Sequence, residues 1–156
     1  MKKIALISCT CLFMDQLIKY LINEWIPLER SISVIGDFFQ MTYIRNYGAA
    51  FNIFTGNRIF LILIALATLC FLYYFLIKDS KNNLLEQLGY GLFIGGILGN
   101  LWDRILNGYV IDYLDFKFMG MHMPIFNYAD ICICIGVFFC IVAFIKEEQH
   151  GRNQSK

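Results

Sequence analysis

Long apolar stretches separated by short polar ones dominate the chain. A bilayer core about 30 Å thick is crossed by about 20 mainly apolar residues, and four stretches have this length, at about residues 4–22, 59–77, 84–105 and 125–145. Because lipid offers the peptide backbone no hydrogen-bond partners, each stretch is expected to be an α-helix. The pattern therefore predicts a polytopic membrane protein with four transmembrane helices.

The segments that follow the first and third predicted helices have the pattern of β-strands. In the first, β-forming residues from Ile32 to Ile44 are interrupted by Gly36 and Asp37, which predicts a short hairpin on the membrane surface. In the second, residues 110–118 alternate well enough for one further strand. The predicted fold class is an all-α polytopic membrane protein with a small extracytoplasmic β-sheet or loop platform, built as one membrane-embedded domain over residues 1–156.

The basic residues that flank the apolar stretches predict the orientation. Lysines and arginines collect on the cytoplasmic side of membrane proteins. They occur before the first stretch, after the second and after the fourth, as Lys2, Lys3, Lys78, Lys81, Lys146 and Arg152. Five basic residues on the other side make this bias modest. We expect both termini in the cytoplasm and the loops at 23–58 and 106–124 outside.

Composition agrees with a membrane protein and excludes some functions. Hydrophobic residues make up 58% of the chain and the mean hydropathy is +0.58, against about 45–50% apolar residues in soluble domains. The net charge of +1, without a block of basic residues, argues against a nucleic-acid partner. The six cysteines lie in apolar stretches, where they are expected to pack rather than to form disulfides. The two histidines belong to no cluster of metal ligands, so neither a metal nor another cofactor is expected.

Several polar residues interrupt the predicted helices. Asp15 and Lys19 are four positions apart and share a helix face; a structural ion pair and a role in supporting an active site both remain open. In the third stretch, glycines at 91, 95 and 99 form a small-residue stripe that predicts close contact with another helix. Just beyond it, Asn100 and Arg104 share a face, although Arg104 could instead reach the membrane surface and pair with the adjacent Asp103.

Asp112 and Asp130 are the candidate catalytic residues. Taken separately, Asp112 could be a loop aspartate and Asp130 a helix N-cap. They become informative because the polar residues of the predicted helices and loops converge on the outer half of the bundle: Asp15, Lys19, Asn46, Asn100, Arg104, Asp112, Asn127 and Asp130. Two neighbouring carboxylates can share a proton and activate a water molecule.

Two other classes of function fit part of this pattern. Charged residues in membrane helices also mark ion pathways, so a small transporter or channel is one alternative; its polar path should continue to the cytoplasmic face, where these helices carry almost no charge. A non-catalytic membrane subunit that docks a partner through the glycine stripe is another. It leaves Asp112 and Asp130 unexplained.

The order and spacing of the polar blocks resemble those of bacterial lipoprotein signal peptidases, the signal peptidase II family. The matching blocks are Asp15-Gln16 with Lys19, residues 46–51, Gly95-Gly96 with Gly99-Asn100 and Asp103-Arg104, Val110 with Asp112-Tyr113, and Phe126-Asn127 with Ala129-Asp130. The resemblance implies an aspartic peptidase of the bacterial plasma membrane. Such an enzyme cuts the signal peptide from a prolipoprotein just before a diacylglyceryl-modified cysteine, so its partners are this substrate and the membrane lipids.

The resemblance also assigns roles to residues. It makes Asp112 and Asp130 the catalytic dyad, near the outer face of the membrane. Supporting or substrate-contacting roles fall to Asn46, Asn100, Arg104 and Asn127, and Asp15 with Lys19 becomes a pair whose role is less defined. The stretch from Gly48 to Phe51 is small and flexible enough to act as a lid over the site.

Overall fold

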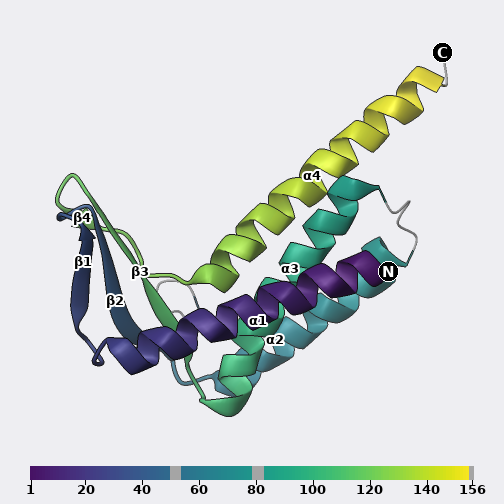
Figure 1. The fold of residues 1–156 in the computed structure, drawn as a ribbon. Coiled ribbons are helices and arrows are strands. Elements are labelled where there is room, and N and C mark those ends of the chain that lie inside the picture. Colours follow the sequence, from purple (N-terminus) through teal and green to yellow (C-terminus); the bar gives the residue numbers. More distant parts are fainter. Residues whose placement is uncertain (50–53, 79–82, 155–156) are drawn as a thin grey trace.

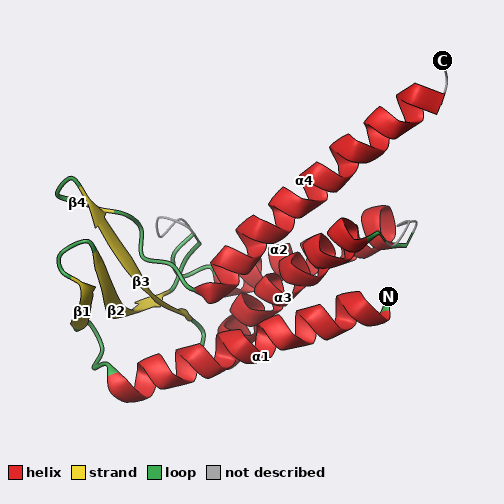
Figure 2. Ribbon diagram, turned by 45° about the horizontal axis from the view of Figure 1, so that its top comes forward, coloured by secondary structure: helices red, strands yellow, loops and turns green. Residues whose placement is uncertain are grey.

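The computed structural model describes residues 1–49, 54–78 and 83–154 as a helical bundle with a small sheet at one end (Figures 1 and 2). The elements are α1 (Lys2–Trp25), β1 (Ser31–Ile35), β2 (Phe39–Asn46), α2 (Arg58–Phe71) with its π-helical continuation η2 (Leu72–Ile77), α3 (Leu84–Leu106), β3 (Val110–Phe118), β4 (Met121–His122) and α4 (Tyr128–Gln154). The helices predicted from the sequence are present, and so is the sheet.

α3 packs directly against α1 along the predicted glycine stripe. A Cβ atom at Gly91 would lie 2.7 Å from the side chain of Ile7, and one at Gly95 would lie 2.9 Å from the Ser8 carbonyl oxygen. Only glycine allows the two backbones to come this close. The predicted close contact is therefore confirmed, and because α1 of the same chain covers the stripe, it offers no free surface to a partner subunit.

A second glycine contact joins α3 to α4. A Cβ at Gly96 would lie 2.8 Å from Ile133 Cγ1, and one at Gly136 would lie 2.9 Å from the carbonyl oxygen of Gly89. Only the first stripe was predicted from the sequence. α3 is thus the central helix, and at its glycines its backbone lies close to both α1 and α4.

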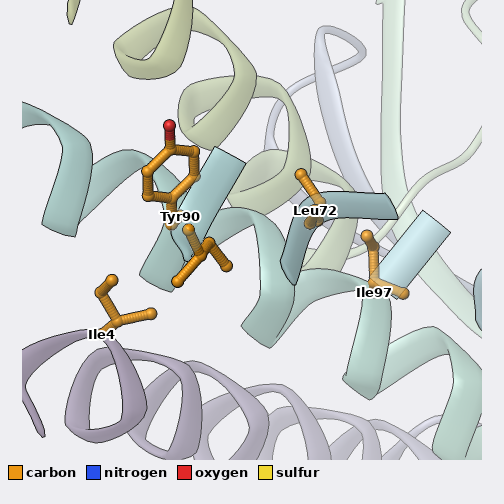
Figure 3. Close-up of a cluster of buried hydrophobic side chains, with 5 residues drawn as sticks. Ile4, Leu72, Tyr90 and Ile97 are labelled. Carbon is orange, nitrogen blue, oxygen red and sulfur yellow. The ribbon is translucent and has the colours of Figure 1, made fainter. Parts of the chain in front are cut away.

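Buried apolar side chains hold the bundle and join it to the sheet. One cluster, from α1, η2 and α3, is formed by Ile4, Leu72, Ile77, Tyr90 and Ile97 (Figure 3). A second joins the end of α1 to the sheet and is formed by Ile22, Ile26, Tyr43, Ile111 and Tyr113. Since the second cluster includes neighbours of Asp112 on β3, it fixes that strand relative to the helices.

The sheet is antiparallel, with strand order β1-β2-β3-β4. Its first hairpin turns at Gly36, which has a φ of +47°, as the Gly36-Asp37 pair predicted. β3 has the predicted bounds, and its register with β2 places Asp112 opposite Ile44 and Val110 opposite Asn46. The pairing therefore brings the end of β2 beside the start of β3.

α4 differs from its predicted range at both ends. It begins at Tyr128 rather than near residue 125, because the Phe126 backbone pairs with Leu114 of β3. It also continues to Gln154, beyond the predicted end near residue 145. Among the described residues, α1 and the part of α4 from Tyr128 to Gln149 are long and apolar enough to cross a membrane, and Arg58–Tyr74 is a shorter apolar helix.

Candidate active site

Asp112 and Asp130 come from different elements and meet at one cavity. Asp112 is on β3 and Asp130 is in the first turn of α4. Asn127 contacts both carboxylates: its Nδ2 donates to Asp112 Oδ1 at 2.7 Å, and its backbone N–H donates to Asp130 Oδ2 at 3.1 Å. Both aspartates line a cavity of about 310 Å³. The two residues predicted to act together are therefore side by side in the fold.

The local structure of α4 explains how Asp130 is held. Asn127 Oδ1 accepts a hydrogen bond from the Asp130 backbone N–H at 3.1 Å, while Asp130 accepts one from the backbone of Asn127. This is a reciprocal capping box. The interpretation of Asp130 as the N-cap is corrected: Asn127 is the cap and Asp130 is its partner one turn later. A carboxylate in this turn is stabilised by the positive end of the helix dipole.

Two further asparagines complete the hydrogen bonding of the carboxylates. Asn46 Nδ2 donates to Asp112 Oδ2 at 2.9 Å, and Asn100 Nδ2 donates to Asp130 Oδ1 at 2.8 Å. Every carboxylate oxygen of the pair thus accepts a hydrogen bond from an amide. Asn46, Asn100 and Asn127, predicted as supporting residues, lie beside the two aspartates.

Burial shifts the proton affinity of Asp112. Its side chain is only 2% exposed. Burial raises the pKa of Asp112 to about 7; the hydrogen bond from Asn46 opposes the shift and the nearby charge of Asp130 adds to it. Near neutral pH, Asp112 therefore keeps its proton in a large share of the molecules.

Arg104 lines the same cavity and is hydrogen-bonded to Gly48, which also contacts Asn46. The Gly48 N–H donates to Asn46 Oδ1 at 2.9 Å, and Arg104 Nη2 donates to the Gly48 carbonyl oxygen at 3.0 Å. Both backbone polar groups of Gly48 are thus held by side chains of the site. The second half of the predicted lid, Ala50 and Phe51, lies outside the described residues.

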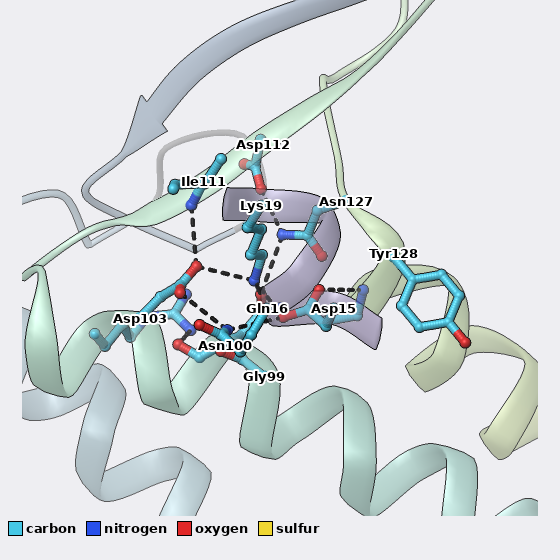
Figure 4. A network of polar contacts seen from close by, with 12 residues as sticks. Asp15, Gln16, Lys19, Gly99, Asn100, Asp103, Ile111, Asp112, Asn127 and Tyr128 are labelled. Atoms are coloured by element: carbon cyan, nitrogen blue, oxygen red, sulfur yellow. Dashed lines mark hydrogen bonds and ion pairs between the residues drawn. The ribbon is translucent and has the colours of Figure 1, made fainter. Parts of the chain in front are cut away.

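Behind the dyad, Lys19 forms a buried ion network (Figure 4). Its Nζ lies 2.8 Å from Asp15 Oδ2 and 2.9 Å from Asp103 Oδ2, and it donates to Asn100 Oδ1 at 3.1 Å. The predicted pair of Asp15 and Lys19 is confirmed. Asp103 does not serve Arg104, the alternative left open by the sequence, because its carboxylate contacts Lys19, Gln16 and the Ile111 backbone N–H.

Asp103 and Gln16 belong to this network, although no role in the site was predicted for either residue. Gln16 Nε2 donates to Asp103 Oδ1 at 3.1 Å and to the Gly99 carbonyl oxygen at 3.2 Å. Asp15 Oδ1 also accepts from the Ala129 N–H of α4 at 3.1 Å. For Asp103 the signal was available in the sequence, since the three N–H donors of a buried lysine point in different directions and a single carboxylate cannot accept from all of them.

Known proteins resemble this chain over most of its length. The family model described as signal peptidase (SPase) II matches residues 7–146. A lipoprotein signal peptidase of Staphylococcus aureus is 38% identical over 149 residues, covering 96% of this chain and 91% of the relative. One from Haemophilus influenzae is 39% identical over 147 residues, covering 92% and 85%.

Solved structures agree with the sequence comparison. Two structures described as bacterial membrane enzymes superpose on the chain with TM-scores of 0.86 and 0.83 at 37% and 38% identity. The first covers 96% of this chain and 92% of the solved one, and the second covers 94% of each. The family match and the two relatives each extend over most of the chain, and this chain belongs to the signal peptidase II family.

Proposed function

We propose that this chain is a bacterial membrane peptidase that removes signal peptides from diacylglyceryl-modified prolipoproteins, with Asp112 and Asp130 as an aspartic catalytic dyad. One observation carries the proposal: Asn127 holds both carboxylates at the same cavity, one through its side chain and one through its backbone. The relatives named lipoprotein signal peptidase support the substrate.

The dyad supplies the acid and base that peptide hydrolysis requires. Two carboxylates this close do not both ionise readily, so one keeps a proton. The ionised partner takes a proton from a water molecule as its oxygen attacks the scissile carbonyl carbon, and the protonated partner donates a hydrogen bond to the carbonyl oxygen. When the C–N bond breaks, a proton from the pair passes to the leaving amine. The pair thus ends the reaction with the same number of protons.

The cavity fits a substrate that is part peptide and part lipid. Its polar lining residues are the dyad with Asn46, Asn100 and Arg104, and its apolar lining residues include Val110, Pro124, Ile125, Phe126, Ile133 and Cys134. A signal peptide is itself an apolar helix and an acylated cysteine carries hydrocarbon chains, so both can approach from the bilayer. We assign peptide contacts to the polar lining residues and acyl-chain contacts to the apolar ones.

We further propose one domain over residues 1–156 with four membrane-spanning helices, both termini in the cytoplasm and the dyad near the outer face of the plasma membrane. The basic residues flanking the helices support this orientation. In Figure 1 both termini lie at the end of the bundle away from the sheet, as this topology requires.

Separate replacement of the two aspartates tests the proposal. Asp112→Asn and Asp130→Asn should each lower the turnover of a diacylglyceryl-modified prolipoprotein by at least about 100-fold, because each removes a group that carries a proton in the reaction. Asp37→Asn is the matched control, since Asp37 is exposed in the β1–β2 turn, and it should cleave at the normal rate. Near-normal turnover by either dyad variant would exclude the aspartic mechanism.

A further inference from the structure

The side-chain amide of Asn100 can point only one way. Its Oδ1 accepts from Lys19 Nζ and from Asn127 Nδ2, both at 3.1 Å. An ammonium group has donors and no acceptor, so the oxygen of Asn100 must face Lys19. The amide nitrogen is then left to donate to Asp130 Oδ1, which it does at 2.8 Å.

Lys19 is itself held rigidly. Its residue is 1% exposed, and its ammonium lies between the carboxylates of Asp15 and Asp103. Those carboxylates are fixed in turn, Asp15 by the Ala129 N–H and Asp103 by the Ile111 N–H. The position of the ammonium is therefore set by four elements of the fold: α1, α3, β3 and α4.

Asp130 differs from Asp112 in the groups that stabilise its charge. It accepts hydrogen bonds from Asn100 Nδ2 and the Asn127 backbone N–H, and it lies in the first turn of α4, where negative charge is favoured. Asp112 also accepts two amide hydrogen bonds, but burial outweighs them and raises its pKa to about 7. The titratable and charged groups around Asp130 are Asp112 and Tyr113 on β3, Arg104 and Asp103 on α3, and Asp15 and Lys19 on α1.

We propose that Lys19 is a positioning residue for the dyad: by orienting the Asn100 amide, it keeps Asp130 as the carboxylate that takes the proton from water and leaves the shared proton on Asp112. This inference rests on the aspartic mechanism proposed above. It answers the question, left open by the sequence, of whether Asp15 and Lys19 only join helices or also serve the site. Lys19 does both. Its ammonium contacts the carboxylates of Asp15 and Asp103, and it also donates to Asn100, whose amide donates to Asp130.

The test is a double variant, Asp15→Asn/Lys19→Met, with saturating lipidated prolipoprotein and kcat measured between pH 4.5 and 8. The two carboxylates and the ammonium of the wild type carry a net charge of −1, and Asp103 alone leaves −1 in the double variant. The change therefore removes the ammonium that orients Asn100 without changing the charge of the network. Asp15→Asn alone is the control, because it keeps the Lys19 contacts with Asp103 and Asn100.

We expect the acidic limb of the kcat profile to move up by about one pH unit in the double variant, a tenfold loss of kcat on that limb, with recovery toward the wild-type value as the pH rises. The Asp15→Asn control should show no upward shift. If Lys19 only joined the helices, the variant would lose thermal stability or active enzyme at every pH while the limb stayed in place, and that result would overturn the proposal.

A second variant keeps the test decisive if the double variant does not fold. Asn100→Ala leaves the Lys19 network with its two carboxylates and removes the donor to Asp130, so its acidic limb should also move up. An unshifted limb in folded Asn100→Ala protein contradicts the inference. Failure of the proposed function looks different, because Asp112→Asn or Asp130→Asn would then retain turnover in the wild-type background.

Discussion

Asp112 makes the stability of the protein depend on pH. Its pKa is raised from 3.8 in the unfolded reference to about 7 in the folded state, chiefly by burial. Between these two values the folded protein holds a proton that the unfolded chain has released. The free energy of unfolding therefore falls as pH rises through this range, by at most about 1.4 kcal/mol per pH unit. Above about pH 7 the loss is complete.

Thermal unfolding in detergent from pH 4.5 to 8 checks this prediction. Asp112→Asn cannot titrate, so its unfolding temperature should fall less across the range than that of the wild type. The comparison uses the pH dependence rather than the absolute stability, because the new amide loses one of the donors from Asn46 or Asn127. Parallel curves for the wild type and Asp112→Asn would contradict the assigned shift, and Asp37→Asn should follow the wild type.

Single residues of the site were predictable where their chemistry conflicts with their surroundings. Asp112, Asp130 and Asn100 were identified because polar groups in a membrane protein are energetically costly and therefore indicate a functional site. The capping role of Asn127 was not, since it depends on where α4 begins, and that start is set by the pairing of Phe126 with β3. Helix ends that depend on a distant strand are not encoded in the local pattern.

At the scale of elements, the contact between α3 and α4 should be sensitive to one methyl group. A Cβ at Gly96 would lie 2.8 Å from Ile133 Cγ1 and 3.1 Å from the Ile133 backbone nitrogen, one turn beyond Asp130. Gly96→Ala should therefore cost about 1–3 kcal/mol of stability and lower turnover by displacing Asp130. Ile105→Ala, at a 49% exposed position of the same helix, is the control and should affect both much less.

Thermal unfolding and prolipoprotein cleavage by the purified variants provide the measurement. Unchanged turnover by Gly96→Ala would show that α4 can move away from α3 without disturbing the dyad.

Elements with a clear period of apolar and polar residues were predicted well, as β3 and the β1–β2 hairpin show. The π-helical end of the second helix was not, because residues 72–77 have the same apolar composition as the α-helix before them.

For the whole molecule, the gathering of the ion network and the dyad at one end argues against a polar path through the bundle. Between Glu86 and Asn100, the residues that α3 buries are Gly89, Tyr90, Gly91, Gly95, Gly96, Ile97 and Gly99. The buried residues of this stretch pack against other helices, and none of them carries a charge that could bind a passing ion. A transporter would require a continuous polar pathway, and α3, the central helix, does not provide one between Glu86 and Asn100.

The number of spanning helices decides on which side of the membrane the end of η2 lies. Four spans place Lys78 in the cytoplasm, whereas crossing by α1 and α4 alone would leave it outside together with the sheet. Single cysteines, Lys78→Cys and Asp37→Cys, in a chain whose six native cysteines are replaced, distinguish the two. A membrane-impermeant maleimide should label Asp37→Cys on intact spheroplasts and Lys78→Cys only after lysis. Labelling of Lys78→Cys on intact spheroplasts would refute the four-span topology, even with both termini in the cytoplasm.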